Sequence, residues 1–126
     1  DLEIFCPPGS KDAQILAELA PEGDELVFSK TTGSVFNGTN IDYVLRNMDI
    51  RTLIMVGVMT SGCVESAVRD AKDLGYGVIV VEDACASWSE ELHRNSLRCM
   101  NEVFAKVKTV DQILTILAEE NSEATT

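Results

Sequence analysis

Residues 52–66, TLIMVGVMTSGCVES, constrain the fold of this chain more than any other stretch. Apolar and β-branched residues run over Thr52–Val56, as they do in a strand that is buried in a sheet. The run breaks at Gly57, passes through small residues at 60–62, and gives way to a helical pattern that begins at Cys63. The stretch therefore predicts a strand, a tight turn and a helix.

The predicted turn places Cys63 at the carboxyl end of a parallel strand, where open α/β sheets bind their ligands. In the first turn of a helix, unpaired N–H groups and the positive end of the dipole favour a thiolate over a thiol. The same N–H groups can hold the oxyanion that forms when a sulfur attacks a carbonyl. The local pattern leaves two interpretations open: Cys63 is a nucleophile, or it is a small buried residue that packs the turn.

Candidate strands alternate with helical patterns along the rest of the chain. Such an order implies right-handed crossovers and a parallel sheet with helices on both faces. We therefore predict an α/β fold, a three-layer α/β/α sandwich around a Rossmann-like parallel sheet, as one domain over residues 1–126. The candidate strands are Glu25–Ser29, Thr52–Val56, Val78–Val81 and Ala105–Lys108.

Apolar residues at helical spacing, together with capping residues, predict the helices. The chain ends on the polar residues Glu119–Thr126, which we expect to be a frayed tail. The predicted helices are a short one within Lys11–Leu19, one capped by Asn40, one over Cys63–Leu74, one after the capping-box pair Ser87 and Glu90, and one after the pair Thr109 and Gln112.

Composition narrows the function classes. A net charge of −11 and a pI near 4.3 argue against a nucleic-acid partner or an anionic membrane surface, since both need a basic face. We expect a cytoplasmic protein, because the sequence has no apolar run of membrane-spanning length and no basic-then-apolar opening. The sequence has neither a GxGxxG turn nor a P-loop, so no cofactor is expected. Four cysteines without CxxC spacing predict no metal site and no disulfide framework: Cys6, Cys63, Cys85 and Cys99.

Three blocks of sequence carry a resemblance to a known family. They are KTTGSVF, which begins at Lys30, GVMTSGCVESAVRDAKDLGY around Cys63, and VVEDACAS, and His93 follows in the next predicted helix. With these blocks the chain resembles the isochorismatase-like cysteine hydrolase superfamily, which includes nicotinamidases, N-carbamoylsarcosine amidohydrolases, ureidoacrylate and biuret amidohydrolases, and isochorismatases. The resemblance implies a hydrolase that cleaves a C–N bond in a small amide, ureido or carbamoyl compound, and a homo-oligomer, either a dimer or a tetramer.

The resemblance also implies roles for individual residues. Cys63 matches the nucleophile that forms an acyl-enzyme, and Lys30 matches the catalytic lysine whose cation stabilises the thiolate. The bond between Val58 and Met59 matches a cis peptide, and the N–H groups of Met59 and Cys63 would form the oxyanion hole. We interpret His93 as a capping or interface residue rather than a base. Further candidates, which line the pocket or belong to the core, are Phe36, Thr60, Cys85 and Trp88.

One part of the family pattern is missing from the chain. Family members open with a strand that ends in an aspartate, the general base of a catalytic triad, and Asp1, Asp12 and Asp24 do not lie in such a context. We therefore expect these 126 residues to be incomplete at the N-terminus, or to be held by another chain. Two alternatives remain: an inactive family remnant that acts as a binding or assembly module, and a flavodoxin- or Rossmann-like binding domain. The loop after Lys30 most resembles the ureidoacrylate and biuret type.

Overall fold

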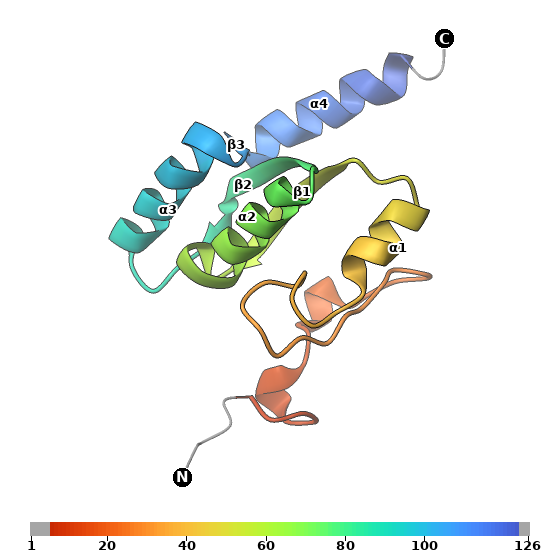
Figure 1. Cartoon of the computed structure of the whole chain (residues 1–126), viewed down its shortest axis with the longest axis vertical. Helices are drawn as coiled ribbons and strands as arrows, with labels where there is room; N and C mark the ends of the chain where they lie inside the picture. The colour runs from red at the N-terminus through yellow and green to blue at the C-terminus, as the bar shows by residue number, and fades with distance from the viewer. Residues whose placement is uncertain (1–5, 124–126) are drawn as a thin grey trace.

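A computed structural model of the chain describes residues 6–123 (Figure 1). Within these residues, four α-helices and three strands alternate along the chain, as expected of an α/β fold. They are α1 (Ile41–Asn47), β1 (Thr52–Val58), α2 (Glu65–Asp73), β2 (Gly77–Ala86), α3 (Glu90–Val103), β3 (Lys106–Lys108) and α4 (Val110–Glu123). A single π turn, Thr60–Val64, separates β1 from α2, and we call it the Cys63 turn.

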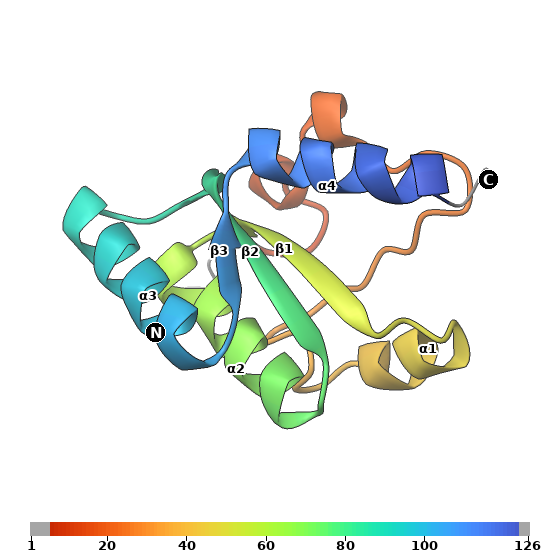
Figure 2. The same ribbon diagram turned by 90° about the horizontal axis from the view of Figure 1, so that it is seen from above.

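The three strands form one parallel sheet in the order β1, β2, β3, which confirms the predicted α/β class. Figure 2 shows the layers: α2 and α3 lie on one face of the sheet, and α4 lies on the other. The turns after the carboxyl ends of β1 and β2 lie side by side, because the two strands pair in parallel up to Val58 and Ala86. The Cys63 turn therefore lies at the edge where α/β folds bind ligands.

The core fills the space between the sheet and the two helices α2 and α3. Side chains at helical spacing on these helices meet the inward side chains of β2, which are β-branched as expected for a buried parallel strand. Leu53 and Met55 of β1 pack against the same cluster. Its buried members are Val64, Val68, Ala71, Tyr76, Val78, Val80, Leu97 and Met100.

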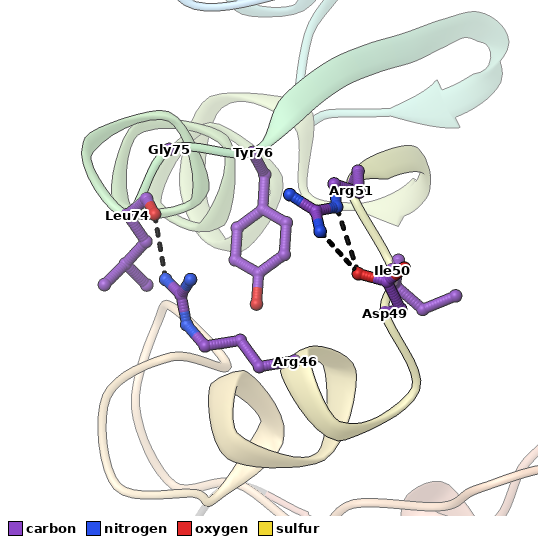
Figure 3. Close-up of a pocket in the computed structure, with 7 residues that line it drawn as sticks. All are labelled: Arg46, Asp49, Ile50, Arg51, Leu74, Gly75 and Tyr76. Atoms are coloured by element: carbon purple, nitrogen blue, oxygen red, sulfur yellow. Dashed lines mark hydrogen bonds and ion pairs between the residues drawn. The ribbon is translucent and has the colours of Figure 1, made fainter.

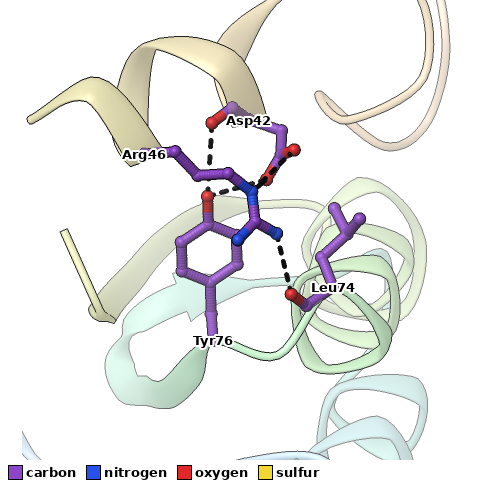
Figure 4. A network of polar contacts seen from close by, with 4 residues as sticks. All are labelled: Asp42, Arg46, Leu74 and Tyr76. Carbon is purple, nitrogen blue, oxygen red and sulfur yellow. Dashed lines mark hydrogen bonds and ion pairs between the residues drawn. The ribbon is translucent and has the colours of Figure 1, made fainter. Parts of the chain in front are cut away.

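Helix α1 is held to the start of β2 by a polar network (Figure 4). The Tyr76 hydroxyl donates to Asp42 Oδ1 at 2.7 Å, and Arg46 Nη2 donates to the Leu74 carbonyl at 2.9 Å. Hydrogen bonds from Arg46 and Tyr76 lower the pKa of the Asp42 carboxyl, whereas burial and Asp42 raise the pKa of Tyr76. The Arg46 guanidinium also lies over the Tyr76 ring, 5.3 Å from its centroid. The network holds α1 against the segment that leads into β2.

A cavity of about 230 Å³ opens beside this network (Figure 3). It lies at the amino ends of β1 and β2, the opposite end of the strands from the Cys63 turn. Both of its arginines are paired, Arg46 with Asp42 and Arg51 with Asp49, so their charges are compensated. Its lining residues are Arg46, Asp49, Ile50, Arg51, Leu74, Gly75 and Tyr76.

The helix starts agree with the capping predictions at one helix and differ at two. At α4 the capping box is confirmed, since Gln112 Oε1 accepts from Thr109 N–H and Thr109 Oγ1 accepts from Gln112 N–H. At α3 the prediction of Ser87 as the cap is wrong: Ser89 caps the helix, accepting from Leu92 N–H at 3.2 Å. Asn40 occupies the cap position of α1 without a side-chain cap bond.

The N-terminal segment differs most from the predictions. Glu25–Ser29 is not a strand, because no neighbouring strand satisfies its backbone and its apolar side chains Leu26 and Val27 are exposed. Lys11–Leu19 contains two separate 3-10 turns in place of one helix. At the other end, the predicted frayed tail is helical up to Glu123, and residues 124–126 lie outside the described residues.

Candidate active site

The Cys63 turn follows β1 directly and places a half-buried cysteine at the end of the strand. Gly57 has a φ of +118°, a conformation that favours glycine, and the chain bends there out of the regular ladder. The peptide bond between Val58 and Met59 is cis. The Met59 carbonyl accepts from Gly62 N–H at 3.0 Å and from Val64 N–H at 3.2 Å, which closes the turn. Single π turns of this kind occur frequently at functional sites.

The α-helix therefore begins at Glu65, whereas the sequence predicted a helix from Cys63. The difference has a local cause, since a π turn spaces its hydrogen bonds one residue wider than an α-helix does. Cys63 still lies in the turn that precedes a helix N-terminus, as the chemistry of a nucleophile requires.

Two hydrogen bonds join the Cys63 turn to the first turn of α3 and to the segment that precedes α3. Thr60, which is fully buried, pairs its hydroxyl with Nδ1 of His93 at 2.8 Å. The next residue, Ser61, pairs its hydroxyl with that of Ser87 at 2.5 Å. Ser87 therefore binds the Cys63 turn and does not cap α3.

A third link joins the start of α2 to the middle of α3. Ser96, which is buried, donates to Glu65, and Arg69 forms an ion pair with the same carboxylate at 2.7 Å. Burial raises the pKa of Glu65, but the hydrogen bonds from Ser96 and Arg69 outweigh it and leave that pKa below its ordinary value. The Arg69 guanidinium lies 4.2 Å from the centroid of the Phe104 ring. The sequence offered one signal for this link, a serine within the apolar stripe of α3.

Lys30 and Cys63 line one cavity of about 320 Å³ beside β1. The two residues that the resemblance pairs are thus brought to the same space from distant parts of the sequence. The Lys30 ammonium donates to the Thr32 carbonyl at 2.7 Å and is otherwise exposed. The remaining walls are apolar or glycine: Gly33, Val35, Ile54, Met55, Val56, Val58, Val64 and Ala67.

The loop that carries Lys30 is held against α2. Asn37 Nδ2 donates to Asp70 Oδ2 at 2.9 Å, and Ser34, a residue of the same loop, is buried. Thr32 donates its hydroxyl to the carbonyls of Ser34 and Asn37, so the loop closes on itself. These contacts explain how an irregular segment can present a lysine at a defined place.

The four candidate pocket residues lie elsewhere, and none of them lines this cavity. Phe36 packs against the core, with its ring 6.0 Å from that of Tyr76, and Thr60 is buried behind the turn. Cys85 packs against the core next to Gly57, and burial raises the pKa of its thiol. Trp88 is 81% exposed at the surface. A position just after a strand end therefore does not by itself direct a side chain into the cavity.

Acidic groups are absent from the lining of the Lys30 and Cys63 cavity in the described part of the chain. Within residues 6–123, no group of three or more histidine, cysteine, aspartate or glutamate side chains is arranged to hold a metal ion. The helices in that range are also too short or too polar to cross a membrane. The cavity thus combines one cation, one thiol and apolar walls.

Curated relatives agree with the resemblance. Isochorismatase family protein YecD of Escherichia coli O157:H7 is 34% identical, over 80% of this chain and 54% of its own length. Ureidoacrylate amidohydrolase RutB of Agrobacterium fabrum is also 34% identical, over 88% of this chain and 49% of its own length. The chain thus spans about half the length of the curated relatives it matches.

Solved structures give the same answer. An isochorismatase-like hydrolase from Alkaliphilus metalliredigens superposes with a TM-score of 0.83 at 36% identity, over 86% of this chain and 60% of that one. The model of the isochorismatase domain family matches residues 2–112, which include the Lys30 loop, the Cys63 turn and His93. The chain belongs to the isochorismatase family.

Proposed function

We propose that this chain carries the nucleophile and lysine of a cysteine amidohydrolase that acts on a small amide, ureido or carbamoyl compound. The observation that carries the proposal is the shared cavity of Lys30 and Cys63. A thiol beside a helix N-terminus and an ammonium group in one pocket form an electropositive site, the setting in which cysteine becomes nucleophilic. The names of relatives point the same way, since they include ureidoacrylate amidohydrolase and nicotinamidase.

The proposed reaction has two steps. A general base takes the proton of the Cys63 thiol, the sulfur attacks the carbonyl carbon to form a C–S bond, and the C–N bond then breaks as the base passes that proton to the leaving nitrogen. Water next attacks the thioester, the C–S bond breaks, and the acid and the free thiolate are released. Each attack passes through an oxyanion, for which the N–H groups of Met59 and Cys63 are the proposed donors.

Lys30 supports this chemistry by charge. A cation near the sulfur favours the thiolate, and the same cation opposes the negative charge that develops on the carbonyl oxygen. The walls that β1 and α2 contribute to the cavity are apolar, so Lys30 is the one cation among the lining residues that the structure describes. A cavity of about 320 Å³ suits a small molecule.

The general base has no candidate within the cavity, where the described lining contains no carboxylate. The resemblance assigns this role to an aspartate on a strand that precedes the matched blocks. We propose that such a strand, from outside these residues, pairs with the open edge of β1. Two facts support this: the relatives are about twice as long as the matched region, and Ile54, Val56 and Val58 of β1 are exposed.

Thiol reactivity tests the proposal directly. Brief treatment with limiting iodoacetamide at neutral pH, followed by mapping of the modified cysteines, should label Cys63 before Cys99, although Cys99 is the more exposed thiol. Lys30→Met should slow the labelling of Cys63 by about threefold to tenfold, because the cation that favours the reactive thiolate is lost. Lys72→Met, which removes an exposed lysine from α2, is the matched control and should have little effect.

The intact mass of the protein, measured in the same experiment, addresses the general base. A mass above 13.7 kDa would support the strand outside these residues, and hydrolysis of a ureido or amide substrate should then accompany the fast labelling. If Cys63 is labelled no faster than Cys99, the proposed nucleophile is wrong, and the inactive binding module becomes the better account.

A further inference from the structure

The contact between Thr60 and His93 has a defined direction. Thr60 is fully buried at the first position of the Cys63 turn, and its hydroxyl lies 2.8 Å from Nδ1 of His93. A buried hydroxyl proton needs an acceptor, and the ring nitrogen is its partner here. Neutral imidazole accepts at Nδ1 when its proton is on Nε2. We infer that the Thr60 hydroxyl is the donor and that Nδ1 of His93 is the acceptor.

His93 lies on a rigid support. It belongs to the first turn of α3, and its N–H donates to the Ser89 carbonyl at 3.0 Å. The Ser89 side chain caps the same turn through Leu92 N–H, and further along the helix Leu97 and Met100 are buried in the core. The position of the imidazole is therefore set by the packing of α3 against the sheet.

The Cys63 turn is closed by backbone hydrogen bonds. The Met59 carbonyl accepts from Gly62 and Val64, Glu65 N–H donates to the carbonyls of Thr60 and Gly62, and a π turn is wider than a turn of α-helix. Thr60 connects this turn to α3 through His93. We propose that His93 is a positioning residue, which acts through the Thr60 hydroxyl to hold the Cys63 sulfur where it can attack. This inference rests on the proposed function, since it concerns the same nucleophile.

His93 acts at a distance from the reacting atoms. It is not among the residues that line the cavity of Lys30 and Cys63, and its Nδ1 is already engaged by Thr60. Its loss should therefore lower kcat and leave KM for a small amide substrate nearly unchanged, because the substrate does not contact it. A residue needed only for folding would change the amount of active protein and not the reactivity of each molecule.

Two amide substitutions of His93 test whether the position of the hydrogen-bond acceptor matters. In His93→Asn the amide is attached at the same carbon as Nδ1 and can still meet the Thr60 hydroxyl, whereas in His93→Gln the amide lies one carbon further out. We expect His93→Gln to slow iodoacetamide labelling of Cys63 about tenfold and His93→Asn to stay within about twofold of the parent. Thr60→Val should match His93→Gln, and Thr60→Ser, which keeps the hydroxyl, should match the parent.

The labelling of Cys85 and Cys99 in each variant reports general loosening, and Arg94→Ala is the control on the exposed side of α3. Slower labelling of Cys63 in His93→Gln alone, with Cys85 and Cys99 unchanged, supports the inference. Equal rates in His93→Asn and His93→Gln, or parallel changes at all cysteines, overturn it. The labelling rate of Cys63 in the parent protein separates the two proposals. Slow labelling in the parent contradicts the role of Cys63 as the nucleophile. Fast labelling in the parent that is not slowed in His93→Gln contradicts only the positioning role of His93.

Discussion

Strands β1 and β2 are neighbours of similar composition, but the side chains that they direct toward the α4 side of the sheet differ in exposure. On β2, Val81 is 3% exposed, because α4 covers this part of the sheet with buried Ile113. On β1, Val56 is 58% exposed and Val58 is 64% exposed. Apolar sequence therefore marks a strand that can be buried, while the cover supplied by neighbouring elements decides whether it is.

On the opposite face of the sheet, both strands pack against the core. Leu53 and Met55 of β1 pack against the core beside Val78 and Val80 of β2, and helix α2 covers both strands. The asymmetry thus belongs to one face and one edge, the edge that also borders the cavity of Lys30 and Cys63. The candidate active site therefore lies at the edge where the described part of the sheet is open.

The largest effect should come from valine truncation on the two strands. Val81→Ala removes two buried methyl groups and should lower the free energy of unfolding by about 2 kcal/mol, through lost burial and the cavity left behind. The matched change Val56→Ala removes exposed methyl groups and should cost about 0.5 kcal/mol or less. Urea unfolding of both variants measures the contrast. Equal losses would mean that β1 is covered in solution by something that buries Val56.

The sequence predicted those parts of the fold in which local pattern and tertiary contact agree. The strand, turn and helix around Cys63 and the Thr109 and Gln112 capping box are examples, since short-range hydrogen bonds define them. Glu25–Ser29 has the composition of a strand, but a strand also needs a partner, and pairing cannot be seen in a local pattern. Two serines, Ser87 and Ser89, compete for one cap, and only the position of the Cys63 turn decides between them.

The candidate site was likewise predicted in part. The local strand, turn and helix pattern identified Cys63 as a candidate, the resemblance added Lys30, and the structure brings the two to one cavity. The contact of Thr60 with His93 was missed, because it joins residues far apart in sequence and neither carries a local signal. Phe36 lies within a loop and Cys85 within β2, which extends to Ala86 and not only to Val81 as predicted, and both side chains pack against the core. Side-chain direction after a strand end depends on backbone detail that composition does not record.

A smaller loss of stability should follow when the hydrogen bond between Ser96 of α3 and Glu65 of α2 is removed. Ser96→Ala removes a hydrogen bond to the Glu65 carboxylate and should lower the free energy of unfolding at neutral pH by about 1.5 kcal/mol. The pKa of Glu65 is depressed in the folded state, so this stability is present above the ordinary glutamate pKa of about 4.3 and is lost as the pH falls through the folded value.

Unfolding of Ser96→Ala at neutral pH and at low pH measures this dependence. The variant and the parent should differ less at low pH, where Glu65 is protonated in both. Glu90→Gln breaks an exposed pair with Arg94 on α3 and is the control, with a far smaller effect expected at neutral pH. A Ser96→Ala loss that does not change with pH would mean that the serine contributes by packing and not through the carboxylate.

The smallest effect on stability, with a distinct effect on association, is expected at the open edge of β1. Its unpaired backbone and exposed Val56 and Val58 form a surface on which another strand can add, and a lysine on an edge strand opposes such pairing. Val58→Lys should change the free energy of unfolding by about 0.5 kcal/mol or less and should shift the protein toward the monomer in sedimentation at rising concentration. The matched control is Val103→Lys, an equally exposed valine on α3. If both lysines reduce association equally, added charge alone explains the result, whereas a response to Val58→Lys only identifies β1 as the surface through which the fold is completed.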